Sequence, residues 1–221
     1  KKAIFHTGEM LTKISNDFSN YKNEKDIEAE LTYYGFKNNL SNAFSPTIAN
    51  GKNACILHYQ SKDSDIDESL VTLIDMGYSY NNYCADITRC IIKKPTKRQL
   101  EVHAAVIEIS DFAHQILKPG IMPRDYEIKV AKFIGEKLKQ LGLIKDLDFG
   151  SIRKYYPHRA SHFLGIDTHD DGDYEKPFRA GAVVTVEPGI YIENEKIGIR
   201  IEDDVLLTDN GNVNLSKSLS R

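Results

Sequence analysis

The sequence has few cysteines and no long apolar run. Its 221 residues include three cysteines, Cys55, Cys84 and Cys90, and no Cys-x-x-Cys pair. An odd, scattered count argues against a disulfide framework and favours a reducing compartment, so we expect a cytoplasmic protein. No apolar run approaches the roughly 20 residues of a membrane span, and the opening KKAIFHTGEM has too short an apolar stretch for a secretory signal. We therefore expect no membrane contact.

The sequence also has no excess of positive charge. Lys and Arg number 29 against 32 Asp and Glu, the formal net charge is −3, and the basic residues are spread along the chain. This balance argues against a nucleic-acid partner. With 41% hydrophobic residues the chain can bury one good core, so we expect a single domain over residues 1–221. The first residue is Lys1 rather than methionine, which indicates a piece of a longer or processed protein.

Three segments combine helical spacing of apolar residues with capping signals. Residues 23–37 begin at a plausible Asn23 cap, and Thr96 with Gln99 predicts a capping box for a helix that ends before Pro119. Residues 123–141 form the third segment, and Gly142 is its expected C-cap. The expected apolar stripes are Ile27, Leu31 and Tyr34; Leu100, Ala104, Ile107, Phe112 and Leu117; and Ile128, Ala131, Ile134, Leu138 and Leu141.

Two pairs of strand-like segments are typical of hairpins. Residues 70–78 and 83–92 are separated by the polar turn 79–82, and residues 181–192 and 197–208 form a similar pair. Each pair contains two acids, one of them followed by x-Gly: Asp75 and Asp86 in the first, Glu187 and Glu202 in the second. This likeness indicates two βα halves that face each other across a cleft, each donating two carboxylates.

These four acids and His162 are the candidate metal ligands. Carboxylates in such apolar strings would be costly to bury together, because like charges repel and desolvation penalises each ion. Two divalent cations would neutralise four carboxylates, with one imidazole as an uncharged ligand. A set of oxygen donors with a single imidazole suits Mn²⁺, Mg²⁺ or Ca²⁺ better than the ligand sets of structural zinc. The residues predict a paired-metal hydrolase, and we expect Mn²⁺.

Four strings resemble the signature blocks of a known family. LIDMGYSYNNYCADITR, HRASHFLGIDTHD, TVEPGIY and GIRIEDDVLLT resemble, in order and spacing, those of the pita-bread metallopeptidases, and most of all the aminopeptidase P branch. The resemblance runs from about residue 20 to the end. It implies the α+β pita-bread fold of creatinase and the aminopeptidases, with two pseudo-symmetric βα halves, a curved and mostly antiparallel sheet, and outer helices. It also implies a catalytic domain over residues 1–221, without the family's usual N-terminal domain.

The resemblance assigns roles to the metal ligands. Asp86 and Glu202 would bridge two divalent cations, Asp75 would complete one site, and His162 and Glu187 would complete the other. Mn²⁺ is expected, with Co²⁺, Zn²⁺ and Fe²⁺ as alternatives. The implied reaction releases the N-terminal residue from peptides with proline in second position through a metal-bridging hydroxide, and Glu187 would exchange the proton. The resemblance further implies a homo-oligomer when the full-length chain is present.

The resemblance also implies residues around the substrate. His58, His158 and His169 would line the cleft, and His158 and His169 would help to stabilise the oxyanion. Tyr191 would lie near the substrate, and Arg200 would support the metal-bound carboxylates. His6, His103 and His114 are expected to be structural, and Asp203 should point away from the metals because alternate side chains share a strand face. Arg159 departs from the family, in which many relatives have glycine.

Three alternatives remain open on the sequence. Prolidase shares the fold but prefers Xaa-Pro dipeptides, and methionine aminopeptidase is a more distant option. A catalytically silent pita-bread module could instead bind a peptide or protein in its cleft, although the complete ligand set argues against it. Without an N-terminal portion, the chain could also fold and yet not turn over. A series of Xaa-Pro peptides of increasing length separates the first alternative from aminopeptidase P.

Overall fold

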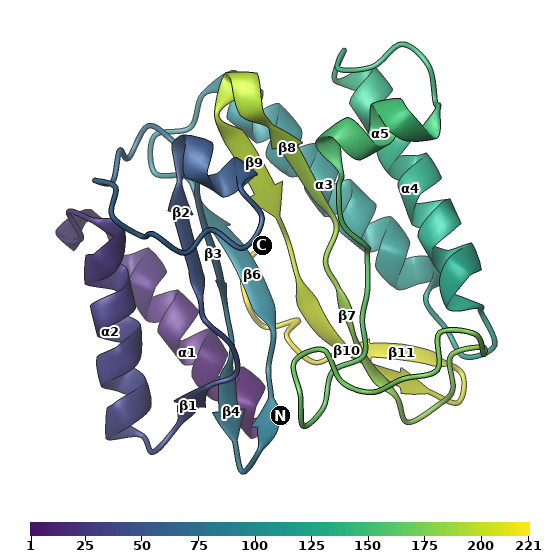
Figure 1. Cartoon of the computed structure of the whole chain (residues 1–221), viewed down its shortest axis with the longest axis horizontal. Helices are drawn as coiled ribbons and strands as arrows, with labels where there is room; N and C mark the ends of the chain where they lie inside the picture. The colour runs from purple at the N-terminus through teal and green to yellow at the C-terminus, as the bar shows by residue number, and fades with distance from the viewer.

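Two α/β halves lie side by side in the computed structural model, which describes residues 1–221. In Figure 1, α1 (Lys2–Asp17) and α2 (Glu24–Lys37) cover the first half, and α3 (Lys97–Ile116) and α4 (Pro123–Gln140) cover the second. Every strand pairing is antiparallel. The architecture confirms the predicted α+β fold with two halves and outer helices.

The first predicted hairpin is present, but it is interrupted in the middle. β3 (Thr72–Met76) pairs with β6 (Ile87–Ile91), and β4 (Tyr78–Tyr80) pairs with β5 (Tyr83–Cys84). Asn81 and Asn82 turn the chain with positive φ angles of 50° and 66°, as a tight two-residue hairpin turn requires. At the interruption, a Cβ on Gly77 would lie 1.6 Å from the Ala85 carbonyl oxygen, so only glycine fits.

The second hairpin repeats this construction. β8 (Gly189–Ile192) pairs with β9 (Ile197–Arg200) near the turn, and β7 (Val183–Val186) pairs with β10 (Asp203–Thr208) beyond an interruption. The two hairpins meet at their interruptions, where the Glu202 backbone N–H donates to the Thr88 carbonyl at 3.2 Å. The acids that the sequence singled out therefore lie where the halves join.

Further strands complete the sheets. β2 (Thr47–Asn50) adds to β3, β1 (Ser41–Asn42) adds to β4, and β11 (Gly211–Asn214) adds to β10. The segment NACILH, which ends at His58, is strand-like in sequence, but it does not form a strand. Gly51–Cys55 forms a 3₁₀ turn directly after β2, and the chain then turns at His58, whose φ is 55°. The apolar residues of this segment lie in the turn because strand β2 ends at Asn50.

The predicted helix starts are confirmed. Asn23 and Thr96 both form capping boxes, with Asp26 and Gln99 as the reciprocal partners, and Gly142 follows α4 with a φ of 74°. The predicted stripe of α3 was out of phase, since Leu100 is 51% exposed; in the predicted stripe of α4, Ile134 and Leu138 are buried as expected, but Ile128 is 57% exposed. The buried faces are Val102, Ala105, Val106, Ile109 and Ala113 on α3, and Tyr126, Val130, Ile134 and Leu138 on α4.

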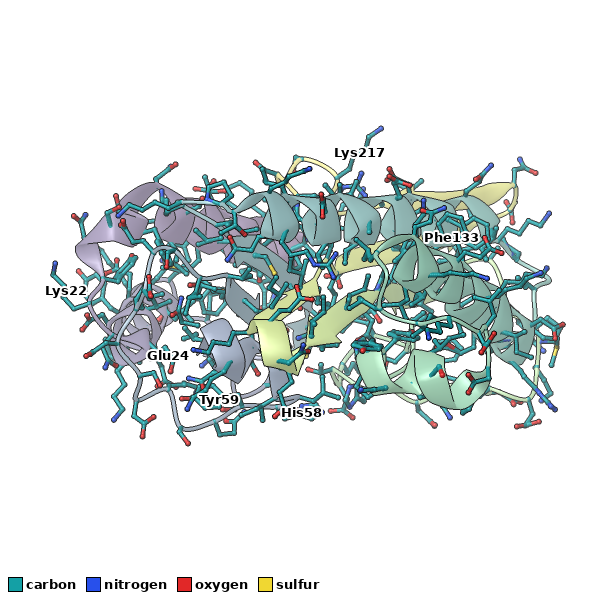
Figure 2. All side chains as sticks on the ribbon, turned by 90° about the horizontal axis from the view of Figure 1, so that it is seen from above. Lys22, Glu24, His58, Tyr59, Phe133 and Lys217 are labelled. Carbon is teal, nitrogen blue, oxygen red and sulfur yellow. The ribbon has the colours of Figure 1, made fainter.

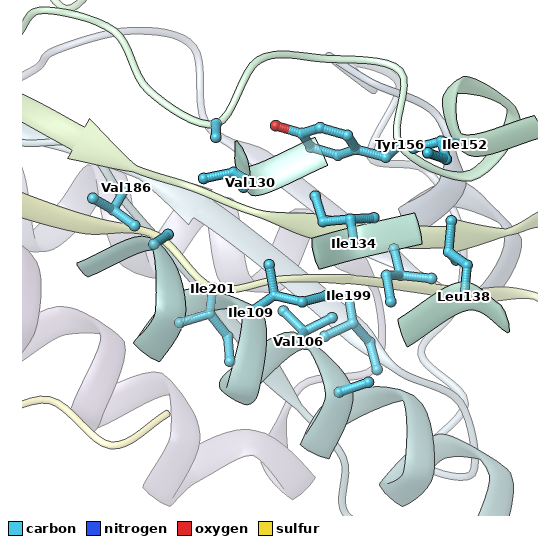
Figure 3. Close-up of a cluster of buried hydrophobic side chains, with 14 of the residues drawn as sticks. Val106, Ile109, Val130, Ile134, Leu138, Ile152, Tyr156, Val186, Ile199 and Ile201 are labelled. Carbon is cyan, nitrogen blue, oxygen red and sulfur yellow. The ribbon is translucent and has the colours of Figure 1, made fainter. Parts of the chain in front are cut away.

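Two hydrophobic cores stabilise the halves. One core of 16 buried residues lies under α1 and α2, and one of 25 lies between the second sheet and helices α3, α4 and α5 (Phe149–Tyr155). Figure 3 shows the larger core, in which Ile109 of α3 and Ile134 of α4 face Ile199 and Ile201 of the strand pair. No helix is long and apolar enough to cross a membrane. The rigid cores fix the hairpins that carry the acids.

Candidate metal centre

The five candidate ligands all line one cavity of about 550 Å³. Asp75 lies in β3, Asp86 lies just before β6, Glu187 follows β7, and Glu202 separates β9 from β10. His162 comes from the loop next to β7, where its backbone N–H donates to the Thr185 hydroxyl at 3.1 Å. The cavity therefore opens at the junction of the two hairpins, as the sequence predicted.

The ligand atoms converge on the ring of His162. Its Nε2 lies 3.3 Å from Asp86 Oδ2, 3.5 Å from Glu187 Oε1 and 4.0 Å from Glu202 Oε1. Asp86, His162 and Glu202 offer ligand atoms that all lie within 4.8 Å of one another. Three groups at this spacing can hold a metal ion, and Glu187 lies at the edge of the same group.

The hydrogen bonds of His162 fix which nitrogen faces these carboxylates. Nδ1 is 2.9 Å from the carbonyl oxygen of Phe163, which can only accept, so Nδ1 carries the proton. Burial lowers the ring's pKa to about 4, so the imidazole is neutral. Its Nε2 lone pair then points at carboxylate oxygens that also carry lone pairs. A cation between them would turn this repulsion into coordination, which is the arrangement that a metal-ligating histidine needs.

The electrostatics of the acids require a counter-charge. Burial, reinforced by the neighbouring carboxylates, raises the pKa of Asp86 and of Glu187 well above the ordinary range and raises the pKa of Glu202 to about 7. Asp75 Oδ1 is buried without any hydrogen-bond partner. Unpaired buried acceptors of this kind are costly, so the donor set fits divalent cations.

Hydrogen bonds from neighbouring residues orient the acids. The Thr88 hydroxyl donates to Glu202 Oε2 at 2.6 Å, and the Thr185 hydroxyl donates to Glu187 Oε1 at 3.2 Å. Neither threonine was predicted as part of the site, because a threonine inside a strand is not distinguished from its neighbours in the sequence. Asp204, which is fully buried, accepts a hydrogen bond from the Asp86 backbone N–H at 3.3 Å. Such contacts hold ligands in place before a metal binds.

Asp203 points away from the acids, as expected, into a network of its own. It pairs with Arg89 at 2.6 Å and with His114 Nε2 at 3.2 Å. Burial opposes its ionisation, but His114 and Arg89 outweigh burial and hold the pKa of Asp203 below its ordinary value. Arg89 also donates to the Glu202 carbonyl at 2.6 Å, so this network supports the backbone of a candidate ligand. His114 does not line the metal cavity, and its contact with Asp203 was not predicted from the sequence.

Arg200, Tyr191 and His158 form a hydrogen-bonded chain beside the acids. Arg200 Nη1 donates to the Tyr191 hydroxyl at 2.8 Å, and this hydroxyl in turn lies 2.8 Å from His158 Nε2. His158 Nδ1 is 2.7 Å from the Arg159 carbonyl oxygen, so Nδ1–H donates there and Tyr191 donates to Nε2. Burial lowers the pKa of His158 to about 3. Arg200 and His158 line the cavity, whereas the buried Tyr191 lies behind them.

His58 and His169 are the more exposed imidazoles of the cavity wall. The His169 ring lies edge-on to His162, with centroids 4.4 Å apart, and its nitrogens form no hydrogen bond within the chain. His58 lies on the loop after β2, next to Tyr59, whose hydroxyl donates to the buried carboxylate of Glu24 at 3.0 Å. In Figure 2, Glu24 lies inward of Tyr59 and His58, on the same side of the molecule. Glu24 was not predicted to be buried, because in the sequence it belongs to a charged run that is typical of the solvent-exposed face of a helix.

The fold and the donor set define a metallopeptidase-like domain with a carboxylate-rich centre, and the comparisons with known proteins agree. The chain belongs to metallopeptidase family M24, which matches residues 1–209. It is 32% identical over 98% of its length to the Xaa-Pro aminopeptidase of Escherichia coli, and 36% identical over 79% of its length to human Xaa-Pro aminopeptidase 3. These matches cover 53% and 38% of the two relatives.

The fold comparison gives the same result. The structure of aminopeptidase P from Escherichia coli with the inhibitor Pro-Leu superposes with a TM-score of 0.93 at 30% identity. The match covers 100% of this chain and 55% of that one. The pita-bread fold and the resemblance to aminopeptidase P are thereby confirmed. The chain spans about half the length of the curated relatives it matches.

Proposed function

We propose that this chain is the catalytic part of a dinuclear metal-dependent aminopeptidase that releases the N-terminal residue from peptides with proline in second position. The observation that carries the proposal is the convergence of Asp75, Asp86, His162, Glu187 and Glu202 on one cavity, where the four carboxylates face a single guanidinium, that of Arg200. The similarity to Xaa-Pro aminopeptidases over nearly the whole chain supports the same substrate class.

The donor set divides between two divalent cations. Asp86 and Glu202 lie between the two hairpins and would serve both ions, Asp75 would complete one site, and His162 with Glu187 would complete the other. The oxygen-rich set favours Mn²⁺ among divalent ions. When bound, such ions supply a nucleophile at neutral pH and polarise the scissile carbonyl.

The chain's own residues would handle the proton and the substrate. Glu187 is the proposed general base, because its carboxylate lines the cavity 3.5 Å from His162 Nε2, where it can take a proton and return it to the proline nitrogen. His169 has no partner in the chain, so its ring N–H is free to donate to a developing oxyanion. His158 and His58 would contact the peptide from the cavity wall. Arg200 and Tyr191 would hold Asp75 and His158 in place.

The direct test uses metal-stripped protein titrated with Mn²⁺ and three peptides: an Xaa-Pro-Yaa tripeptide, an Xaa-Pro dipeptide and a Met-Ala-Yaa control. We expect release of the first residue from the tripeptide alone, saturating near two ions per chain. A preference for the dipeptide would replace the proposal with prolidase. Cleavage of the control would indicate a methionine aminopeptidase, and no turnover by the metal-loaded chain would contradict the proposal.

A further inference from the structure

A second cavity of about 470 Å³ adjoins the metal cavity. It lies between α4, α5 and the loops on either side of His162. Arg159, Ser161 and Tyr174 line both cavities, so the two form one continuous cleft. None of the residues that line only the second cavity belongs to the candidate metal centre.

The chemistry of the second cavity differs from that of the first. Half of its 16 lining residues are hydrophobic, and three large apolar side chains at its rim are unusually exposed: Ile128 at 57%, Leu147 at 44% and Phe149 at 68%. Exposed apolar side chains that gather in one hollow are typical of binding sites. The metal cavity, by contrast, is lined mainly by polar and charged groups.

The second cavity also has a positive rim. Arg124, Lys132, Arg153 and Arg159 line it against Glu127 and Glu175. Glu127 is already engaged, because both of its oxygens accept from the Ala160 backbone N–H. Arg159 packs over the Tyr174 ring, with Cζ 5.3 Å from the centroid, and forms no ion pair. The uncompensated charge at the junction of the two cavities is therefore that of the Arg159 guanidinium.

An unpartnered hydroxyl lies at the same junction. Ser161 is 7% exposed, and its Oγ is buried with no hydrogen-bond partner. The Tyr126 hydroxyl, from the wall of the second cavity, is buried and unpartnered as well. Buried hydroxyls normally find partners, and backbone groups of a bound peptide would supply them.

We propose that the second cavity is the subsite for the peptide segment that follows the scissile bond. Its apolar wall would take a hydrophobic side chain of that segment, and Arg159 would contact the segment's free carboxylate. The inference rests on the proposed function: an aminopeptidase that releases one residue leaves the rest of its substrate on the carboxyl side. A long peptide therefore needs room there, and its negatively charged end matches the positive rim.

The test measures binding without turnover. Calorimetry with the Mn²⁺-loaded chain gives dissociation constants for three peptides that mimic the released product: Pro-Leu-Leu, Pro-Gly-Gly and Pro-Leu-Leu-amide. We expect Pro-Leu-Leu to bind about 10-fold more tightly than Pro-Gly-Gly, because a partly buried leucine side chain gains affinity of this order. Phe149→Ala should remove most of that difference. Phe36→Ala is the matched control, since Phe36 is an 86% exposed phenylalanine on α2.

A second variant tests the charged part of the subsite. Arg159→Gln should weaken Pro-Leu-Leu several-fold but leave Pro-Leu-Leu-amide unchanged, because only the acid carries the carboxylate. Equal binding of all three peptides by the wild type would overturn the inference. So would a Phe149→Ala variant that weakens Pro-Gly-Gly as much as Pro-Leu-Leu, or a chain that binds none of them. Selective binding without any hydrolysis of Xaa-Pro peptides would refute only the proposed function.

Discussion

Arg200 Nη2 lies 2.6 Å from Asp75 Oδ2, which joins the last residue of β9 to a candidate metal ligand of the other half. The same guanidinium donates from Nε to the Thr88 hydroxyl at 2.9 Å and from Nη1 to the Tyr191 hydroxyl at 2.8 Å. One planar group therefore orients three partners, and it is the only Arg or Lys side chain within 4.0 Å of the four candidate carboxylates. It leaves Asp75 Oδ1 without a partner and free to bind a metal.

Replacing Arg200 by lysine tests whether the planar guanidinium group is needed, or only its positive charge. Arg200→Lys keeps the charge but cannot reach three partners at once, so we expect the free energy of unfolding to fall by about 2–4 kcal/mol. Urea denaturation of the metal-stripped protein measures the change. Arg124→Lys is the control, because Arg124 is exposed and has no ion-pair partner. A wild-type midpoint for Arg200→Lys would show that charge alone is sufficient.

The raised pKa of Glu202, about 7, predicts a pH dependence of stability in the absence of metal. A carboxyl whose pKa is higher in the folded state than in the unfolded state, about 4.3, binds more protons when folded. Its contribution is present at low pH and is lost as the pH rises from about 4 to 7. Because the buried histidines titrate in the opposite sense, the quantity to measure is the difference between wild type and Glu202→Gln.

We expect the wild type to lose up to about 3 kcal/mol relative to Glu202→Gln across that range. Urea titrations at several pH values give the two curves. Added Mn²⁺ should restore the wild type but not the variant, because metal binding to the folded state stabilises it. Parallel curves for the two proteins would mean that Glu202 titrates normally.

The contacts of Glu24 predict that its replacement will lower the stability of the protein and displace the loop that carries His58. Its buried carboxylate accepts from the Asn50 backbone N–H at 2.8 Å, Asn53 Nδ2 at 3.0 Å, the Tyr59 hydroxyl at 3.0 Å and the Ser64 backbone N–H at 3.2 Å. These bonds fix the loop that carries His58. Glu24→Ala removes the acceptor that these four donors share and leaves the two backbone N–H groups without a partner, so we expect a loss of about 2–4 kcal/mol of unfolding free energy.

The positioning effect has its own measurement. If His58 contacts the peptide, Glu24→Ala should raise KM for an Xaa-Pro-Yaa peptide more than it lowers kcat, and should leave metal affinity unchanged. Glu30→Ala is the control on the same helix, since the Glu30 ion pair with Lys13 is partly exposed on both sides and worth less than about 1 kcal/mol. An unchanged KM would mean that Glu24 stabilises the fold but does not position His58 for the substrate.

The sequence predicted the parts of the molecule that depend on local chemistry. The caps at Asn23 and Thr96 and the turn at Asn81 and Asn82 follow from side chains that act within a few residues of themselves. The direction of Asp203 followed from strand alternation. These features need no knowledge of distant contacts.

The features that were not predicted correctly depend on packing between segments that are distant in the sequence. The buried face of α3 is set by the sheet beneath it, so Leu100 is exposed although it fits the helical spacing. Helix α1 has Ile4, Leu11 and Ile14 at suitable spacing but no cap that forms a side-chain hydrogen bond, and it was not predicted. The roles of Thr88 and Glu24 arise from contacts 114 and 35 residues away, which a single sequence does not reveal.

The central claim is that the buried acids bind a pair of divalent cations, and a direct binding measurement tests it. Equilibrium dialysis of the metal-stripped chain against Mn²⁺, read by elemental analysis, should give about two ions per chain for the wild type. Asp86→Ala should abolish binding, because Asp86 belongs to the group that surrounds His162. His103→Ala should bind normally. A wild type that binds no metal, or an Asp86→Ala variant that still binds two ions, would contradict the account.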